Sequence, residues 1–279
     1  MNIKCWGSRG SVSVSGKEYL KYGGDTTCIE IIANSGETVI IDAGTGIRKL
    51  GTDLVSGGKS QYYLLFTHVH WDHIAGFTFF KPLLYKNRSI EIQNNIFSNI
   101  HVKDILNDLT KPPFFPVTMQ DFNSTITFRD DLTGKFSIGS LDIETIRLSH
   151  PGGGNGYKFT ENNRSFVFLT DNELNFDHPG SSGFDSFLNF AKNTDILFHD
   201  AEFTPEEYLS RKKWGHSSYT DVLDLALKAN VKKLGLFHLN QEREDREMDK
   251  IVVECRKIIT QNNSLLDCFG VASGMSFML

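Results

Sequence analysis

The sequence predicts an α/β fold in which two β-sheets pack face to face and helices cover their outer surfaces. Runs of β-branched and aromatic residues, bounded by turn residues, occur in both halves of the chain. Segments with apolar residues at helical spacing follow these strand clusters in each half. The 279 residues, 39% of them hydrophobic, can bury a substantial core. No long linker divides the chain, so we expect one domain over residues 1–279.

The first half begins with short strands. They are expected at 2–6, 26–33, 37–44 and 61–67. A helix is expected between them at 45–57, where apolar residues recur at helical spacing before a closing glycine. Residues 81–140 are irregular, with one expected helix at 95–109 and then the turn-forming stretch KPPFFPV.

The second half continues with strands and then alternates strands with helices. Strands are expected at 140–150, 156–160, 164–171, 195–201 and 232–239. Helices are expected at 204–212, 218–229 and 244–261.

Composition and charge argue against several classes of function, although they leave room for a local basic groove. The net charge of −5 and the pI near 6.0 argue against a broad surface for nucleic acid or anionic membranes. No apolar stretch approaches the ~18 residues of a membrane span, and the start MNIKCWGSRGS has no signal-peptide pattern. The four cysteines are scattered without C-x-x-C spacing, as is typical of reduced thiols. We therefore expect a cytoplasmic protein without a membrane partner.

The segment THVHWDH gathers strong metal ligands directly after an apolar strand. His68 and His70 are two residues apart, and in an extended chain such side chains point the same way. Asp72 and His73 follow where the chain should turn into a helix, which aims them at a second, adjacent position. The cluster predicts a metal site at the end of this strand.

Further ligand-type side chains close other expected strands. His150 ends LDIETIRLSH, Asp171 ends RSFVFLTD and His238 ends KKLGLFH. Together with the THVHWDH cluster they fit two neighbouring metal ions bridged by one carboxylate. The carboxylates and a bridging hydroxide would offset most of the charge of two divalent ions, and an anionic substrate could offset the rest.

Motifs along the whole chain resemble one family. IIDAGTG, THVHWDH, SHPGG, LTDNE, FHDAEFTPEEY, WGHSS and LFHLN occur in this order. In these motifs the sequence resembles the metallo-β-lactamase-fold hydrolases, in particular the branch of phosphodiesterases and the tRNA 3′-end processing ribonuclease Z. The resemblance implies a four-layer αββα sandwich with the site at one edge between the sheets. Members are commonly homodimers, so it also implies a homodimer.

The resemblance also implies a full ligand set. One ion is held by His68, His70 and His150. The other is held by Asp72, His73 and His238, and the two ions are bridged by Asp171. The many histidines make Zn²⁺ the expected metal, with Mn²⁺ as the alternative.

Two such ions suit hydrolysis of a phosphodiester, because they generate hydroxide near neutral pH and stabilise in-line attack. Expulsion of an alkoxide still calls for a proton donor. In the phosphodiesterase branch the histidine that matches His216 is the general acid, and the acidic residue that matches Asp200 orients and charges it. The resemblance thus implies catalytic roles for His216 and Asp200, and for Asp72 beside its metal role.

Several positions keep two interpretations. Asp42 could support the ligands by hydrogen bonding or belong to a structural turn. Arg9 could meet a phosphate or brace its loop. The PGGG stretch after His150 could admit substrate to the backbone or form a simple turn.

The stretch KPPFFP is equally open. Lys111, Phe114 and Phe115 could hold an anion and stack a base, or form a hydrophobic lid. His199 alternates with Asp200 and is expected to be packed on the other side. His101 and His178 receive no role.

The expected substrate is a small phosphodiester such as a cyclic nucleotide. Ribonuclease Z grips tRNA with a Gly- and Lys-rich arm, and residues 81–140 contain no such basic arm. Three other functions known for this fold remain alternatives: tRNA 3′-end processing, thioester or lactone hydrolysis, and redox chemistry. Flavodi-iron proteins use a glutamate where His70 stands, and thioester or lactone hydrolysis would not require the Asp200–His216 pair.

Overall fold

The computed structural model describes residues 1–279 and is built on two seven-stranded sheets. In spatial order, the strands of the first sheet are β16 (Ser276–Met278), β1 (Asn2–Gly7), β2 (Cys28–Ile32), β3 (Thr38–Ile41), β4 (Gln61–Leu65), β5 (Ser89–Gln93) and β8 (Thr125–Arg129). Those of the second sheet are β15 (Asp267–Gly270), β14 (Lys233–Phe237), β13 (Ile196–Asp200), β12 (Arg164–Leu169), β11 (Asn155–Glu161), β10 (Leu141–Arg147) and β9 (Lys135–Ile138).

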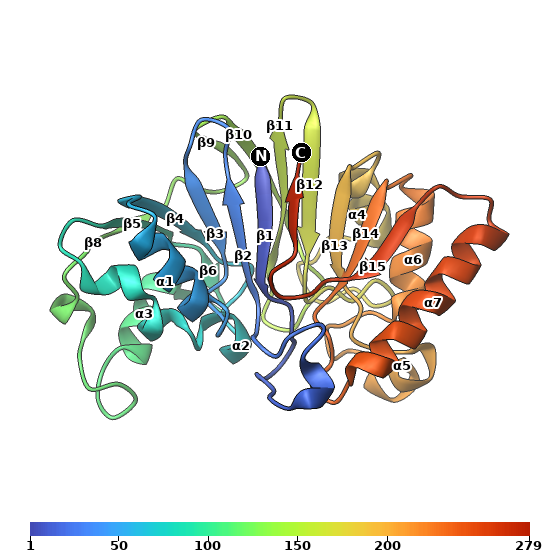
Figure 1. The fold of residues 1–279 in the computed structure, drawn as a ribbon, viewed down its shortest axis with the longest axis horizontal. Coiled ribbons are helices and arrows are strands. Elements are labelled where there is room, and N and C mark those ends of the chain that lie inside the picture. The colour runs from blue at the N-terminus through green and yellow to red at the C-terminus, as the bar shows by residue number, and fades with distance from the viewer.

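Helices cover the outer face of each sheet (Figure 1). Those that accompany the first sheet are α1 (Ile47–Ser56), α2 (Trp71–Ile74) and α3 (Val102–Leu109). Those that accompany the second sheet are α4 (Phe184–Ala191), α5 (Pro205–Arg211), α6 (Tyr219–Lys228) and α7 (Asp245–Gln261). Short 3₁₀ turns lie at Lys17–Tyr19, Phe77–Phe79, Lys81–Leu84 and Met119–Asp121. The predicted four-layer αββα sandwich is confirmed.

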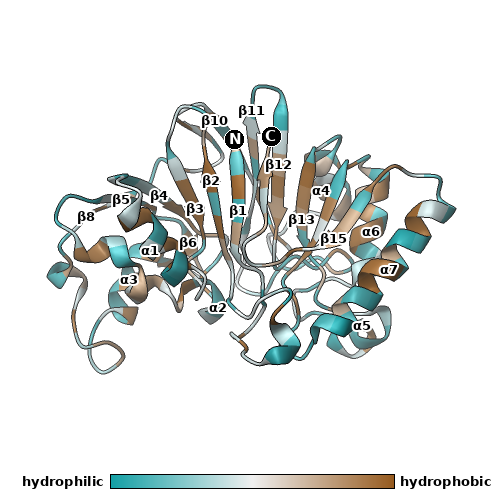
Figure 2. Cartoon of the chain, viewed as in Figure 1, coloured by the Kyte–Doolittle hydropathy of each residue, from teal (hydrophilic) through white to brown (hydrophobic).

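Separate apolar clusters fill the spaces between the layers. Strand β12 shows how alternate residues of one strand belong to two different clusters. Phe166 and Phe168 belong to the cluster between the sheets, whereas Val167 and Leu169 belong to the cluster under α4, α6 and α7. This follows from the period of two in a strand, which sends successive side chains to opposite faces. Figure 2 shows brown, apolar strands in the centre and teal residues on the outer surface.

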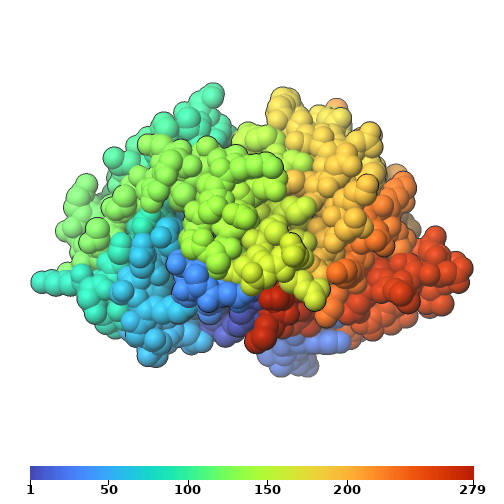
Figure 3. Space-filling model, turned by 90° about the horizontal axis from the view of Figure 1, so that it is seen from above, coloured from blue at the N-terminus to red at the C-terminus, as the bar shows by residue number.

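The two halves of the chain meet along the middle of the molecule. The N-terminal nitrogen of Met1 contacts the Glu161 carboxylate at 2.6 Å and donates to the Leu279 carbonyl at 2.9 Å. Figure 3 shows the green segment after β8 lying between the blue-to-cyan first half and the orange-to-red second half. Contacts between residues far apart in the sequence therefore join the two sheets.

The structure corrects one expected element. The helix expected at 95–109 begins only at Val102, and residues before it form a small hairpin of β6 (Ile96–Phe97) and β7 (Ile100–His101). Its turn residues Ser98 and Asn99 have positive φ angles of 50° and 65°. Asn and Ser favour such turns, so local turn chemistry ends the helical pattern early.

No helix of the chain is both long and apolar enough to cross a bilayer. All four cysteines are buried and free, as the sequence predicts.

Candidate metal centre

The candidate ligands lie at one edge of the sandwich, the lower edge in Figure 1. β4 runs toward this edge and is followed by His68, His70 and helix α2. Asp171 and His238 follow the ends of β12 and β14, with left-handed φ angles of 58° and 55°. Such backbone is uncommon outside glycine and clusters at functional sites.

The first group of ligands consists of three imidazoles. The ring centroids of His68, His70 and His150 lie 4.5, 4.7 and 4.8 Å apart. Nε2 of His150 lies 2.9 Å from Nδ1 of His70. The two histidines after β4 and the one after β10 therefore converge, although the strands belong to different sheets.

The second group contains Asp72, His73, Asp171 and His238, all buried. Nε2 of His73 lies 3.3 Å from an oxygen of each aspartate. Nε2 of His238 lies 3.2 Å from Asp72 and 3.3 Å from Asp171. Helix α2 turns Asp72 and His73 inward together, as the spacing predicts.

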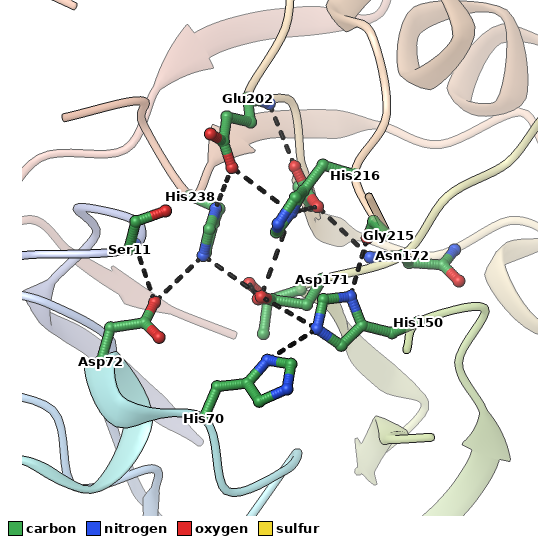
Figure 4. Close-up of polar contacts among 12 residues, drawn as sticks. Ser11, His70, Asp72, His150, Asp171, Asn172, Glu202, Gly215, His216 and His238 are labelled. Atoms are coloured by element: carbon green, nitrogen blue, oxygen red, sulfur yellow. Dashed lines mark hydrogen bonds and ion pairs between the residues drawn. The ribbon is translucent and has the colours of Figure 1, made fainter. Parts of the chain in front are cut away.

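Asp171 lies between the two groups (Figure 4). Besides the second group, its Oδ2 lies 3.6 Å from Nε2 of His68 and 3.8 Å from Nε2 of His150. A single carboxylate thus faces both sets of imidazoles, which is the position that a bridging ligand needs.

Hydrogen bonds fix which nitrogen of each ring faces the centre. Nδ1 of His150 lies 3.0 Å from the Gly215 carbonyl, which can only accept, so Nδ1 carries the hydrogen. Likewise, Nδ1 of His73 donates to Asp42 at 2.8 Å and Nδ1 of His238 donates to Glu202 at 3.0 Å. With Nδ1 engaged in this way, each ring presents its Nε2 to the centre.

Thr67 completes this pattern for His68. Its hydroxyl donates to Asp42 at 2.7 Å, so it can only accept from Nδ1 of His68, 3.2 Å away. Asp42 also accepts from the Thr67 backbone at 2.8 Å. The hydrogen-bonding interpretation of Asp42 agrees with these contacts.

The donor set fits divalent metal ions. Nε2 of His68 and Nε2 of His73 are buried and have no hydrogen-bond partner within the protein. Buried polar atoms are rarely left unpaired, and a cation in reach of these lone pairs would satisfy them. Imidazole nitrogens and carboxylate oxygens at one place are the ligands that Zn²⁺ and similar ions take.

The charge states differ between the two groups of ligands. Burial lowers the pKa of His150 to about 3 and that of His68 well below its usual range, so both are neutral. Burial by itself would raise the pKa of Asp171, but His238 and His73 hold it well below its usual range. Burial would lower the pKa of His73 and His238, but the neighbouring carboxylates raise both well above the usual range. Neutral imidazoles and ionised carboxylates are the forms that bind metals, so binding at the second group would displace a proton from each of these two rings.

His216 lies beside the ligands without joining either group fully. Its ring centroid is 5.3 Å from that of His150 and 4.7 Å from that of His238. Nδ1 of His216 donates to Asp200 at 2.7 Å and lies 3.4 Å from Glu202. Burial would lower the pKa of His216, but Asp200 and Glu202 raise it to about 9. This imidazole therefore carries a proton near neutral pH.

Two buried glutamates were missed from sequence. Glu202 connects His238 and His216, and its second oxygen accepts from Asn240 at 2.8 Å. Glu173 accepts from the backbone nitrogens of Lys213 and Gly215 at 2.8 and 2.9 Å. The clustering of acids in HDAEF and TDNEL after strands was the available signal for both.

Arg9 braces its loop and does not face the centre. Its side chain is buried, and its guanidinium donates to the backbone carbonyls of Gly23, Asn240 and Arg243. The structure favours the bracing interpretation.

The loop that Arg9 braces touches the second ligand group. Ser11 donates its backbone N–H to Asp72 at 2.9 Å (Figure 4). Gly10 lies so close to His238 that a Cβ would come within 2.3 Å of its ring. Only glycine fits there, which accounts for the glycine in GSRGS.

The remaining candidates, in the KPPFFP stretch, contact residues other than the ligands. Lys111 pairs with Asp108 at 2.5 Å on the surface. Phe114 is 73% exposed and shares an apolar hollow with Trp71, whereas Phe115 packs edge-on against Phe79 at 5.9 Å.

The unassigned histidines are also placed. His199 is buried and donates to the Asp200 carbonyl at 2.7 Å, in agreement with the expected packed position. His178 contacts Glu173 at 3.0 Å, and His101 lies in β7.

A family model described as "Beta-lactamase superfamily domain" matches residues 37–239. The chain belongs to this superfamily. The matched segment contains every candidate ligand from His68 to His238. Ribonuclease Z of Oceanobacillus iheyensis is 24% identical over 244 residues, which cover 70% of this chain and 76% of that protein.

Solved structures show the same superfamily fold. The metallo-β-lactamase-fold protein YhfI from Bacillus subtilis has a TM-score of 0.69 at 16% identity, covering 99% of this chain and 98% of that one. A diphosphatase from the PhnP family has a TM-score of 0.66 at 16% identity, covering 100% of this chain and 97% of that one. These likenesses confirm the fold, and with the family match and the ligand clusters they identify a metal-dependent hydrolase.

Proposed function

We propose that this superfamily member is a cytoplasmic phosphodiesterase with two metal ions that acts on a small nucleotide, such as a cyclic nucleotide. The proposal includes one domain over residues 1–279 and assembly as a homodimer. It is supported by an imidazole, His216, that holds a proton beside the two ligand groups.

The ligand groups suggest how the ions would be held. The first ion would take His68, His70 and His150. The second would take Asp72, His73 and His238, with Asp171 shared. Zn²⁺ is the first candidate because imidazoles dominate, and Mn²⁺ is the alternative for such nitrogen and oxygen ligands.

When bound, such ions supply Lewis-acid stabilisation of the phosphoryl oxygens and a water of lowered pKa. The protein must still protonate the departing oxygen, because an alkoxide is a poor leaving group. Nδ1 of His216 is engaged by Asp200, so the proton available for transfer is on Nε2. Asp200 is fully buried, so its carboxylate has little freedom to turn away from His216. The carboxylate therefore holds the His216 ring in one orientation.

The observation that carries the proposal is the hydrogen bond of 2.7 Å between Nδ1 of His216 and Asp200, beside the candidate ligands. The ring centroid of His216 lies 4.7 Å from that of His238 and 5.3 Å from that of His150. A thioester releases a stable thiolate and would gain little from such an acid. A phosphodiester needs it, so the arrangement favours phosphodiester cleavage.

Processing of the tRNA 3′ end is the second candidate, because relatives such as the one from Oceanobacillus iheyensis are named ribonuclease Z. Against it, residues 81–140 contain seven Lys/Arg against six Asp/Glu and no basic arm, and several of these cations are paired. Lys111 pairs with Asp108, and Arg129 pairs with Asp131 at 2.6 Å. Binding of RNA depends mainly on free cations that meet phosphates, so a small substrate is favoured.

The test combines metal analysis with hydrolysis of bis(p-nitrophenyl) phosphate, with and without a chelator. We expect bound transition metal, and hydrolysis that the chelator abolishes and added Zn²⁺ or Mn²⁺ restores. A panel of 2′,3′- and 3′,5′-cyclic nucleotides, dinucleotides and a precursor tRNA then separates the two candidates. Activity on thioesters or lactones without phosphodiesterase activity would overturn the proposal.

A further inference from the structure

A second cavity of about 250 Å³ opens near the metal centre at the same edge of the sandwich. It lies between the end of β5, the end of β10 and the start of β11. Asn155 in its wall donates its backbone N–H to the Thr67 carbonyl at 2.8 Å, and Thr67 directly precedes His68. The cavity and the metal ligands are therefore attached to the same backbone.

The charge of the cavity wall is positive. Arg147 is the one ionisable residue in this wall, and its guanidinium has no carboxylate within ion-pair distance. Its side-chain hydrogen bond goes to Oδ1 of Asn155 at 3.3 Å. By contrast, two other strand arginines, Arg129 and Arg164, each form an ion pair with a carboxylate. Arg147 thus keeps donor groups free for an anion.

A buried donor in the same wall also lacks an acceptor. Asn95 is 9% exposed, and its Nδ2 is buried without a hydrogen-bond partner. The neighbouring Gln93 does not serve it, because both lone pairs of its Oε1 are taken, by Tyr157 at 2.5 Å and by the Phe66 N–H at 3.4 Å. An unpaired buried amide is destabilising, and Asn95 belongs to the cavity wall, so an acceptor bound there would stabilise this donor.

A glycine brings the Arg147 guanidinium close to the metal ligands. Nη2 of Arg147 lies 2.7 Å from where a Cβ would stand on Gly153, whose φ is 79°. The N–H of Gly153 in turn donates to the His150 carbonyl at 2.9 Å. The PGGG stretch therefore lets the guanidinium pack on the short loop that carries His150. A side chain at 153 would displace the guanidinium and strain the backbone.

We propose that this cavity is an anion subsite that binds a second phosphate group of the substrate, held by Arg147 and Asn95. The wall offers a free guanidinium and an unpaired amide donor and no carboxylate, which is the chemistry that recognises a phosphate. The inference rests on the proposed phosphodiesterase function and narrows its substrates to nucleotides that carry an additional phosphate.

The test uses two chromogenic esters that differ by one phosphate group. They are thymidine 5′-(p-nitrophenyl phosphate) and the same ester with a 3′-phosphate. For the wild type we expect KM to be roughly tenfold or more lower for the 3′-phosphorylated ester, as for one charge-assisted contact. Arg147→Gln should bring the two KM values together, and Asn95→Leu should narrow the ratio less.

Lys135→Gln is the matched control. Lys135 lies near this edge and pairs with Glu144, but it is absent from the cavity wall. The Lys135→Gln substitution removes one positive charge, as Arg147→Gln does. If direct contact with Arg147 causes the preference for the 3′-phosphorylated ester, and not the overall positive charge of this edge, the ratio of the two KM values should stay as in the wild type. A wild type without preference, or a ratio that survives Arg147→Gln, would refute the subsite. Hydrolysis of bis(p-nitrophenyl) phosphate separates these results from failure of the proposed function, since in the latter case no ester would be cleaved.

Discussion

His150 and His216 are neighbouring imidazoles whose Nδ1 partners give them different charges. His150 donates to the neutral Gly215 carbonyl, and burial then lowers its pKa to about 3. His216 donates to the Asp200 carboxylate, which with Glu202 outweighs burial and raises its pKa to about 9. One ring therefore offers a lone pair and the other a proton, although their centroids are 5.3 Å apart.

This difference leads to a prediction for His216→Ala. We expect kcat for phosphodiesters to fall by about 10²–10⁴-fold, the usual contribution of a general acid. Metal content should stay at the wild-type level, because the ligand groups keep all their members. Steady-state kinetics and metal analysis check this, with the exposed His101→Ala as control. Loss of metal together with activity would instead assign His216 a ligand role.

Glu202 leads to a second prediction at the same scale. Its carboxylate accepts from Nδ1 of His238 and so makes Nε2 a stronger ligand. Glu202→Gln should weaken binding of one metal ion by about 10–100-fold. Metal titration followed by calorimetry measures this, and the exposed Glu206→Gln is the control. Equal affinities in both variants would contradict the positioning role.

At the scale of elements, a loop between α5 and α6 carries His216 to the metal centre. The Glu173 carboxylate, from the segment after β12, accepts the N–H groups of Lys213 and Gly215 and the hydroxyl of Tyr208 at 2.7 Å. Gly215 then accepts from His150. The position of His216 thus depends on a buried carboxylate from another part of the chain.

Glu173→Ala should destabilise the fold by about 1–3 kcal/mol, because it leaves the buried N–H of Gly215 without an acceptor. Tyr208→Phe removes one hydrogen bond and leaves the carboxylate in place, so its effect should be smaller, about 0.5–1.5 kcal/mol. Urea unfolding of both variants measures the two free energies. A larger loss in Tyr208→Phe would show that the backbone contacts matter little.

Asp195, just before β13, connects the neighbouring strands of the second sheet. It accepts from the Ser165 backbone at 2.9 Å, from Arg164 at 3.0 Å and from Lys232 at 2.7 Å. Burial would raise the pKa of Asp195, but Lys232, Ser165 and Arg164 outweigh it and lower the pKa.

A lowered folded-state pKa gives a pH prediction with a definite sign. The ionised Asp195 stabilises the fold above its unfolded pKa of about 3.9, and this stabilisation is lost as pH falls through the folded pKa. The urea midpoint of unfolding of Asp195→Asn should therefore lie below that of the wild type at pH 6. At pH 3 the difference between the two midpoints should be smaller. A gap that stays constant over this range would contradict the assignment.

At the scale of the whole molecule, the candidate metal centre lies where the two sheets meet. The loop and helix after β4 of the first sheet provide some of the candidate ligands, and segments after β10, β12 and β14 of the second sheet provide the others. Bound ions would thus link the halves at the edge opposite to the Met1–Glu161 contact.

Metal removal should consequently lower the thermal stability of the entire fold. A ligand that binds only the folded state stabilises it by about 4 kcal/mol when its free concentration exceeds Kd a thousandfold. Chelated protein should melt at a lower temperature, and Zn²⁺ should restore the transition. Differential scanning calorimetry measures both, and Asp171→Asn should respond less. An unchanged melting temperature would contradict a metal link between the sheets.

Local patterns sufficed for much of the candidate site. The spacing of THVHWDH and the histidines and aspartates that close apolar strands depend only on periods of two and on strand ends, which are readable along the chain. The helix expected at 95–109 was wrong in its first half, because turn-forming Ser98 and Asn99 outweigh the apolar spacing.

The sequence by itself determined the layered α/β fold and the residues that converge at one edge, because both follow from periodicity and from where strands end. Only the tertiary structure decided that Arg9 braces a loop, that Glu202 and Glu173 position the histidines, and that Arg147 and Asn95 share a cavity. These relations join residues far apart along the chain. Burial, unpaired donors and charge partners arise only when such segments pack together, so no local pattern records them.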